Sequence, residues 1–182
     1  MDGQEARERD IQEDAATLTA VADSAPLKLE QFLPYQLGVV ATLMSQALSR
    51  VYARRYHLGI PEWRVLVVLA QFGWINGKAI CTHTHMHKTK VSRAVAILER
   101  RKLVARRANR ADMRESLVAL TPAGRTIYED LAPHAVDFTH RLTEILTPSD
   151  REAFQRALKQ LTNRSAQLVA EAIEQDDIAE EP

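Results

Sequence analysis

The segment from residue 87 to residue 121 constrains the possible fold of this chain more than any other. It begins with the amphipathic pattern "HKTKVSRAVAILERRKL", in which Val91, Val95 and Leu98 form one apolar stripe of a helix. Two short strand-like runs follow, "LVARRA" and "ESLVALT", joined by the polar loop "NRADMR". Such runs on either side of a polar loop are typical of a β-hairpin. The segment therefore predicts a helix followed by a hairpin with a charged tip.

Three helical patterns precede this segment. Apolar residues recur at spacings of three and four between Phe32 and about His57, and predict a first helix that stops at "HLGIP". Pro61 suits the first turn of a second helix, "PEWRVLVVLAQF", whose nearly continuous apolar run indicates deep burial. "GWING" predicts a turn, and a short helix is expected over about 77–84.

Two long helices are expected after the hairpin. Thr121-Pro122 and Thr147-Pro148 each combine a capping hydroxyl with a proline suited to the first helical position. The last helix carries a narrow apolar seam of coiled-coil type. Its members are Phe154, Leu158, Leu161, Ser165, Leu168 and Ala172. Such a seam packs either on the core of its own chain or on a second copy of the chain. Because the first helix and the last two all carry stripes, a homodimer is expected.

These patterns together predict a mainly α fold, a winged helix-turn-helix whose N- and C-terminal helices form a dimerisation region. Residues 1–31 are expected to be an acidic, disordered arm. Residues 32–60 and 122–175 are assigned to the dimerisation region, and 61–121 to the winged helix-turn-helix lobe. Residues 176–182 are assigned to an acidic tail.

Charge is distributed unevenly along a chain whose formal net charge is zero. Residues 1–31 carry three basic and eight acidic side chains, residues 88–114 carry ten basic and two acidic, and the last twelve carry six acids. A basic block between acidic ends indicates a local binding surface for a polyanion.

Composition also limits the compartment and the chemistry. The single cysteine, Cys81, excludes an internal disulfide, the N-terminus lacks the apolar run of a signal peptide, and no stretch approaches the ~20 apolar residues of a membrane span. A cytoplasmic protein is therefore expected. No Ser/His/Asp constellation, glycine-rich phosphate loop or paired carboxylates at helical spacing stands out, so an enzyme is not expected.

The order of elements and two motifs resemble the MarR family of bacterial transcription regulators over roughly residues 32–170. "KTKVSRAVAILERRKLVAR" is similar to the family's recognition helix and first wing strand, and "DMR" ahead of "LTPAGR" is similar to its Asp-x-Arg wing signature. The resemblance implies a homodimer that binds double-stranded DNA. It also implies a repressor released by a small ligand.

A recognition helix places its N-terminal residues against base edges and phosphates in the major groove. Arg114 resembles the wing arginine that enters the minor groove, and Asp112 is expected to orient Arg114 or nearby backbone rather than to touch DNA. The alternative to DNA binding is that these basic residues only form a solvated face of the helix. The expected DNA-binding residues are His87, Lys88, Thr89, Lys90, Ser92, Arg93, Arg110, Asp112 and Arg114.

The tract "CTHTHMH" offers a competing hypothesis, because Cys81, His83, His85 and His87 are residue types that ligate zinc. The chain would then be a metal-responsive regulator or a metal-binding interaction module. On a helix, however, alternate members of the tract point apart, and the helix-turn interpretation breaks it near His85. A structural or DNA-proximal role is favoured, with no metal and no other cofactor expected. Cys81 is expected to be a buried packing residue.

The effector is the least constrained part of the hypothesis. Residues 32–69 resemble the MarR subgroup that controls hydroxycinnamate catabolism and senses aromatic acyl-CoA thioesters, and arginines there suit an anionic effector. A free aromatic carboxylate is the alternative. Each residue expected to line the site also has an ordinary packing or surface explanation. The candidates are Tyr35, Arg50, Arg54, His57, Trp63 and His134.

Overall fold

The structure is a computed structural model that describes residues 26–109 and 114–179, with side chains described as far as residue 175. It is mainly helical with one small antiparallel sheet, so the predicted fold class is confirmed. The chain divides into two compact units, one ending at Ala47 and the other beginning at Leu48. No helix of the described residues is long and apolar enough to span a membrane.

The first unit contains a short 3-10 helix, Leu29–Gln31, and the greater part of helix α2, Leu33–Tyr56. The side chain of Gln36 donates a hydrogen bond of 2.6 Å to the carbonyl oxygen of Glu30, so the short helix is attached to α2. Residues 26–31, which the sequence assigned to a disordered arm, therefore contain local structure, and residues 1–25 lie outside the described residues. Most large apolar side chains of this unit are exposed.

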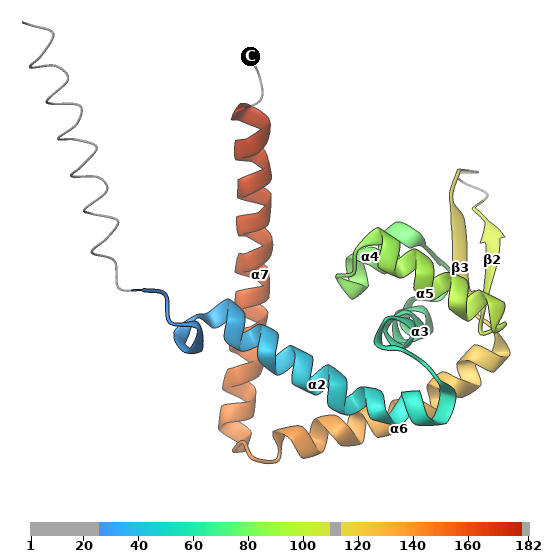
Figure 1. Cartoon of the computed structure of the whole chain (residues 1–182), viewed down its shortest axis with the longest axis horizontal. Coiled ribbons are helices and arrows are strands. Elements are labelled where there is room, and N and C mark those ends of the chain that lie inside the picture. The colour runs from blue at the N-terminus through green and yellow to red at the C-terminus, as the bar shows by residue number, and fades with distance from the viewer. Residues whose placement is uncertain (1–25, 110–113, 180–182) are drawn as a thin grey trace, which may run out of the picture. The chain divides into compact units, whose positions relative to one another are not determined.

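The second unit contains the end of α2 and all the later elements (Figure 1). These are α3 (Ile60–Phe72), β1 (Ile75–Asn76), α4 (Gly77–Thr84), α5 (Lys88–Arg100), β2 (Val104–Ala108), β3 (Ser116–Leu120), α6 (Pro122–Thr143) and α7 (Pro148–Ala179). The helices predicted from the sequence are all present. The helix α7 continues through Ala179, beyond the expected limit of the dimerisation region at residue 175.

The sheet has the order β1-β3-β2 with antiparallel pairs throughout. In the predicted hairpin, Val104 pairs with Leu120 and Ala108 with Ser116. The prediction of "GWING" as a turn alone was incomplete, because Ile75 pairs with Val118 and forms a third, two-residue strand with its neighbour Asn76. So short a strand depends on a partner distant in sequence, and it carries no period-2 pattern of its own.

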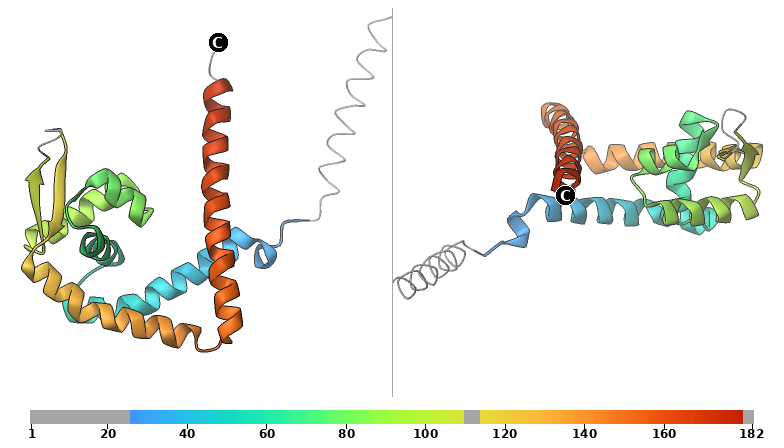
Figure 2. Two further views of the ribbon diagram at one scale, coloured as in Figure 1. Left: turned by 180° about the vertical axis from the view of Figure 1, so that it is seen from behind. Right: turned by 90° about the horizontal axis from the view of Figure 1, so that it is seen from above.

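A single apolar core holds the winged lobe together. Helix α3 contributes Val65, Leu66 and Leu69, all fully buried, which agrees with the deep burial predicted for this helix. Ile80 of α4 and Leu98 of α5 join the same cluster. The views from the front, from behind and from above agree in placing the β2–β3 hairpin beside α5 (Figures 1 and 2).

Both predicted threonine caps are confirmed. The hydroxyl oxygen of Thr121 accepts a hydrogen bond of 3.1 Å from the backbone N–H of Gly124 at the start of α6. At the start of α7, the hydroxyl of Thr147 accepts a hydrogen bond of 3.1 Å from the N–H of Asp150 and donates one of 2.6 Å to its carboxylate. These bonds satisfy amides that the first turn of a helix leaves without a partner.

Candidate nucleic-acid interface

The turn between α4 and α5 is fixed by short polar contacts. The buried hydroxyl of Thr84 donates to the carbonyl oxygen of Ile80 at 2.7 Å and accepts from the N–H of Met86 at 3.3 Å. His85 ends α4 in the left-handed region, with φ of 52°, where histidine is among the tolerated residues. Met86 is buried in the core cluster, as expected for a residue that packs the two helices together.

His87 caps the helix that follows. Its Nδ1 accepts a hydrogen bond of 3.3 Å from the backbone N–H of Thr89, so the ring occupies the N-cap of α5. The capped helix buries Val91, Ala94, Val95 and Leu98. The opposite face is exposed. Its first turns present Lys88, Thr89, Lys90, Ser92 and Arg93 to solvent.

The wing is attached to both helices of the helix-turn-helix. Arg106 of β2 lies 3.4 Å from the carboxylate of Glu99 on α5, and it donates a hydrogen bond of 2.8 Å to the hydroxyl of Ser116. Asn76 accepts from the N–H of Ala79 at 2.8 Å as the N-cap of α4, and its amide nitrogen donates to Glu115 at 2.6 Å. The base of the wing is therefore held in a defined position relative to α4 and α5.

The arginines of the wing have different surroundings. The guanidinium of Arg107 lies over the ring of Trp74, 4.1 Å from its centroid, so this arginine is held by a cation–π contact. Arg114 is exposed just before the start of β3. Two of the predicted DNA-binding residues, Arg110 and Asp112, lie outside the described residues.

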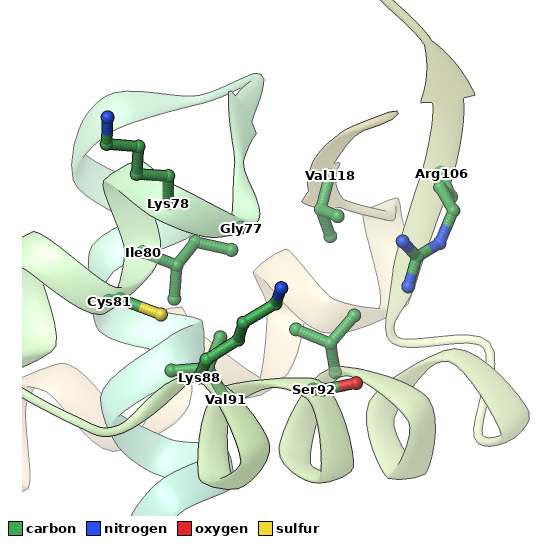
Figure 3. A pocket seen from close by; sticks show the side chains of 10 residues that line it. Gly77, Lys78, Ile80, Cys81, Lys88, Val91, Ser92, Arg106 and Val118 are labelled. Carbon is green, nitrogen blue, oxygen red and sulfur yellow. The ribbon is translucent and has the colours of Figure 1, made fainter. Parts of the chain in front are cut away.

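A cavity of about 520 Å³ lies among α4, α5 and the sheet (Figure 3). Its wall is largely apolar, with Ile80, Val91 and Val118, and Lys88 and Arg106 also line it. The sulfur of Cys81 points toward this space, and the residue is half-buried. Cys81 packs against the core cluster as predicted, but it is only partly buried.

Each histidine of the "CTHTHMH" tract has a separate structural position. His83 stacks on Phe72 of α3 with ring centroids 3.9 Å apart, while His85 ends α4 and His87 caps α5. Within the described residues no group of three or more histidine, cysteine, aspartate or glutamate side chains is placed to hold a metal ion. The described residues give the metal-binding alternative no support.

Among the candidate ligand residues, Trp63 lies in the core. It stacks between Tyr52 of α2 and Tyr128 of α6, with centroid distances of 5.5 and 6.2 Å. Burial raises the pKa of the Tyr52 hydroxyl above its usual value. This aromatic column connects three helices of the second unit.

A polar cluster lies between the end of α2 and α6. Arg55 forms an ion pair of 3.0 Å with Asp130, and its guanidinium lies 3.4 Å from Nε2 of His134, another candidate ligand residue. Tyr56 donates a hydrogen bond of 2.9 Å from its hydroxyl to the same carboxylate. That bond raises the pKa of Tyr56, because it is lost when the phenol ionises.

The remaining candidates are exposed. Arg50 and Arg54 lie on α2, and His57 follows the helix in the left-handed conformation, with φ of 50°. Tyr35 belongs to the first unit and is exposed there. Their role in ligand binding stays a prediction.

Sequence reasoning missed Asn76 and Arg101, which connect elements of the lobe. Asparagine directly before a short helix is a preferred N-cap, so "NG" could have been interpreted as a helix start as well as a turn. Arg101 lies at the end of α5 and donates to the backbone carbonyl oxygens of Tyr56 and His57. No local pattern marks a contact between residues so distant in sequence.

Comparison with known proteins gives a consistent result. Residues 58–115 match the family model described as MarR family. The chain is 30% identical over 126 residues to a Bacillus subtilis (strain 168) protein described as the uncharacterized HTH-type transcriptional regulator YwoH, and the match covers 69% of this chain and 90% of that protein.

Two solved structures are also similar. A MarR family transcriptional regulator from Silicibacter pomeroyi has a TM-score of 0.63 and 28% identity, with 74% of this chain and 90% of that chain covered. The other has a TM-score of 0.60 and 26% identity, with 70% and 98% covered. It is described as showing the mechanism for regulation of DNA binding of Bordetella bronchiseptica BpsR by 6-hydroxynicotinic acid.

Proposed function

The chain belongs to the MarR family of transcription regulators, and from that premise we propose that it is a homodimeric repressor that binds a palindromic operator. The observation that carries the proposal is the exposed, N-capped start of α5, with two lysines, an arginine and two hydroxyl side chains on one face. Cations contact phosphates, and arginine and short polar side chains bind base edges in the major groove.

A palindromic site has twofold symmetry, so the protein that binds it is proposed to be a symmetric dimer. Two copies of α5 have to reach half-sites about one helical turn, or roughly 34 Å, apart. The apolar seam of α7 supports such an assembly, because Phe154, Leu161 and Leu168 are exposed in the described chain. Apolar faces of this kind on long helices are usually covered by another protein surface.

The wing supplies the second contact of the proposal. With its base attached through Arg106 and Asn76, the β2–β3 hairpin is proposed to contact the DNA beside the major groove that α5 enters. Arg114 is proposed to enter the minor groove, with Arg110 as a further DNA contact and Asp112 orienting Arg114 or nearby backbone.

Arginine substitutions test the DNA-binding proposal. A duplex selected from a random-sequence pool by the full-length protein serves as the probe, and fluorescence anisotropy gives its affinity. Arg93→Ala and Arg114→Ala are each expected to lower the affinity by about 1–3 kcal/mol, roughly 5- to 150-fold, while sedimentation still shows a dimer. Affinity should also fall steeply with salt. Arg125→Ala on α6 is the matched control, and unchanged affinity in both test variants would exclude the mechanism.

The proposed effector is a small aromatic anion that releases the operator, either an aromatic acyl-CoA thioester or an aromatic carboxylate. Arg50, Arg54 and His57, all exposed on or just after α2, support an anionic ligand. A hydroxycinnamoyl-CoA, the corresponding free acid and coenzyme A alone are the three probes. Release of the duplex by the thioester, but by neither the free acid nor coenzyme A, supports the first ligand class. Release by the free acid supports the second. No release by either probe contradicts both.

A further inference from the structure

Arg101, at the end of α5, also binds the end of helix α2. The N–H of Arg101 donates to the carbonyl oxygen of Ile97 at 3.2 Å, and Lys102 then turns the chain with φ of 59°. Directly afterwards, Leu103 donates to the carbonyl oxygen of Leu98 at 2.9 Å and is buried. The backbone of Arg101 is therefore fixed relative to α5.

The side chain of Arg101 reaches the carboxyl end of α2. Its Nη2 donates to the carbonyl oxygen of Tyr56 at 2.6 Å, and its Nη1 donates to that of His57 at 3.2 Å. The last carbonyl groups of a helix lack amide partners within the helix, and the helix dipole favours a cation there. A guanidinium also offers donors in a fixed planar fork, which suits two adjacent acceptors.

Tyr56 connects the same point to a third helix. Its carbonyl oxygen accepts from Arg101, while its hydroxyl donates to Asp130 of α6 at 2.9 Å. The ion pair from Arg55 occupies the other carboxylate oxygen of Asp130. The last turn of α2 is thus attached to α5 through its backbone and to α6 through its side chains.

We propose that Arg101 is a positioning residue that fixes the direction of the recognition helix α5 relative to α2, and through Tyr56 relative to α6. This inference rests on the proposed function, in which α2 belongs to the dimerisation region and α5 binds DNA. The spacing of two recognition helices in a dimer then depends on how firmly each α5 is attached to α2.

The alternative is that Arg101 contributes only to the stability of the fold. Both of its hydrogen bonds are exposed, and solvent reduces the net stability that even a charge-assisted bond contributes, because water replaces it in the unfolded chain. The buried face of α5, with Ala94 and Leu98, keeps the helix in the lobe without Arg101. Removing the guanidinium therefore loosens the direction of α5 without unfolding it.

The dependence of affinity on half-site spacing tests the positioning of α5 separately from the stability of the fold. The full-length wild-type protein first selects a duplex from a random-sequence pool, and variants of that duplex gain or lose one base pair between the half-sites. The wild type is expected to bind the altered duplexes about tenfold or more weakly, because one base pair rotates and shifts one half-site relative to the other. Arg101→Gln is expected to show a penalty of about threefold or less.

Arg100→Gln is the matched control, since it removes the same charge from an exposed side chain in the same turn of α5. It should keep the wild-type spacing penalty even if its overall affinity falls. An unchanged penalty in Arg101→Gln, with a wild type that selects a duplex normally, overturns this inference alone. A wild-type chain that selects no duplex overturns the proposed function, and the inference falls with it.

Discussion

At the scale of single residues, three positions combine an unusual backbone conformation with an ordinary side chain. His57, His85 and Lys102 all have positive φ, between 50° and 59°. Each lies at or just beyond the end of a helix, where glycine or asparagine is commonly found. The first two are histidines, which tolerate this region better than most residues, whereas Lys102 has no such local compensation.

Replacing Lys102 by glycine should therefore stabilise the protein. The left-handed conformation costs a residue with a Cβ roughly 1–2 kcal/mol, and the greater freedom of glycine in the unfolded chain offsets part of that gain. We expect the free energy of unfolding to rise by roughly 0.5–1 kcal/mol in urea denaturation. Lys102→Ala, which removes the charge but keeps the Cβ, is the control. Equal stability in the glycine and alanine variants would show that the conformation is not strained.

His87 has two separable roles, as the N-cap of α5 and as a proposed DNA contact. Asparagine also caps helices well, so His87→Asn should match or exceed the stability of the wild type, while His87→Ala should lose roughly 0.5–1 kcal/mol. If the imidazole also contacts a phosphate, His87→Asn weakens binding to every duplex sequence about equally. Denaturation and anisotropy measure the two effects. Wild-type affinity in the asparagine variant would restrict His87 to capping.

At the scale of elements, the sequence predicted what local patterns encode. The helix starts at Thr121 and Thr147 follow from capping residues, and the limits of the hairpin follow from apolar runs around a polar loop. The strand Ile75–Asn76 and the bonds of Arg101 were not predictable in this way. They depend on partners many residues away, and two residues or one arginine show no periodicity.

The same distinction between local patterns and contacts with distant residues applies to the candidate interface. The exposed face of α5 was predicted from its apolar stripe, because burial of one face of a helix determines the opposite one. The sequence did not separate the roles of the wing arginines. Arg106 and Arg107 are neighbours in β2, yet one pairs with Glu99 and the other stacks on Trp74. Alternation along a strand predicts that they point to opposite faces, but not which partners they meet there.

The junction of the wing with α6 depends on a glycine. A Cβ added to Gly124 would overlap the backbone carbonyl oxygen of Leu103, which itself accepts a hydrogen bond of 3.0 Å from the N–H of Thr121. Since backbone cannot move as a side-chain end does, Gly124→Ala should lower the free energy of unfolding by about 1–3 kcal/mol. Ala123→Ser, an exposed neighbour, is the control for denaturation measurements. Wild-type stability in Gly124→Ala would mean that α6 can shift without cost.

At the scale of the whole molecule, the predicted seam on α7 can now be compared with its surroundings. Phe154, Leu158, Leu161 and Leu168 recur at helical spacing and are all exposed in the described chain. The second unit, to which α7 belongs, does not bury them. The proposed homodimer would cover this seam, which accounts for apolar residues along so long a helix.

A charge placed on the seam should therefore dissociate the proposed dimer. Leu161→Glu puts a carboxylate where a partner's apolar surface is expected, and burying an unpaired charge is strongly unfavourable. Sedimentation should show the variant as a monomer at concentrations where the wild type is a dimer. Because both half-sites then have to be bound independently, affinity for the selected duplex should fall by at least about tenfold. Gln160→Glu adds the same charge beside the seam and should leave both properties unchanged. A dimeric Leu161→Glu protein would place the interface elsewhere.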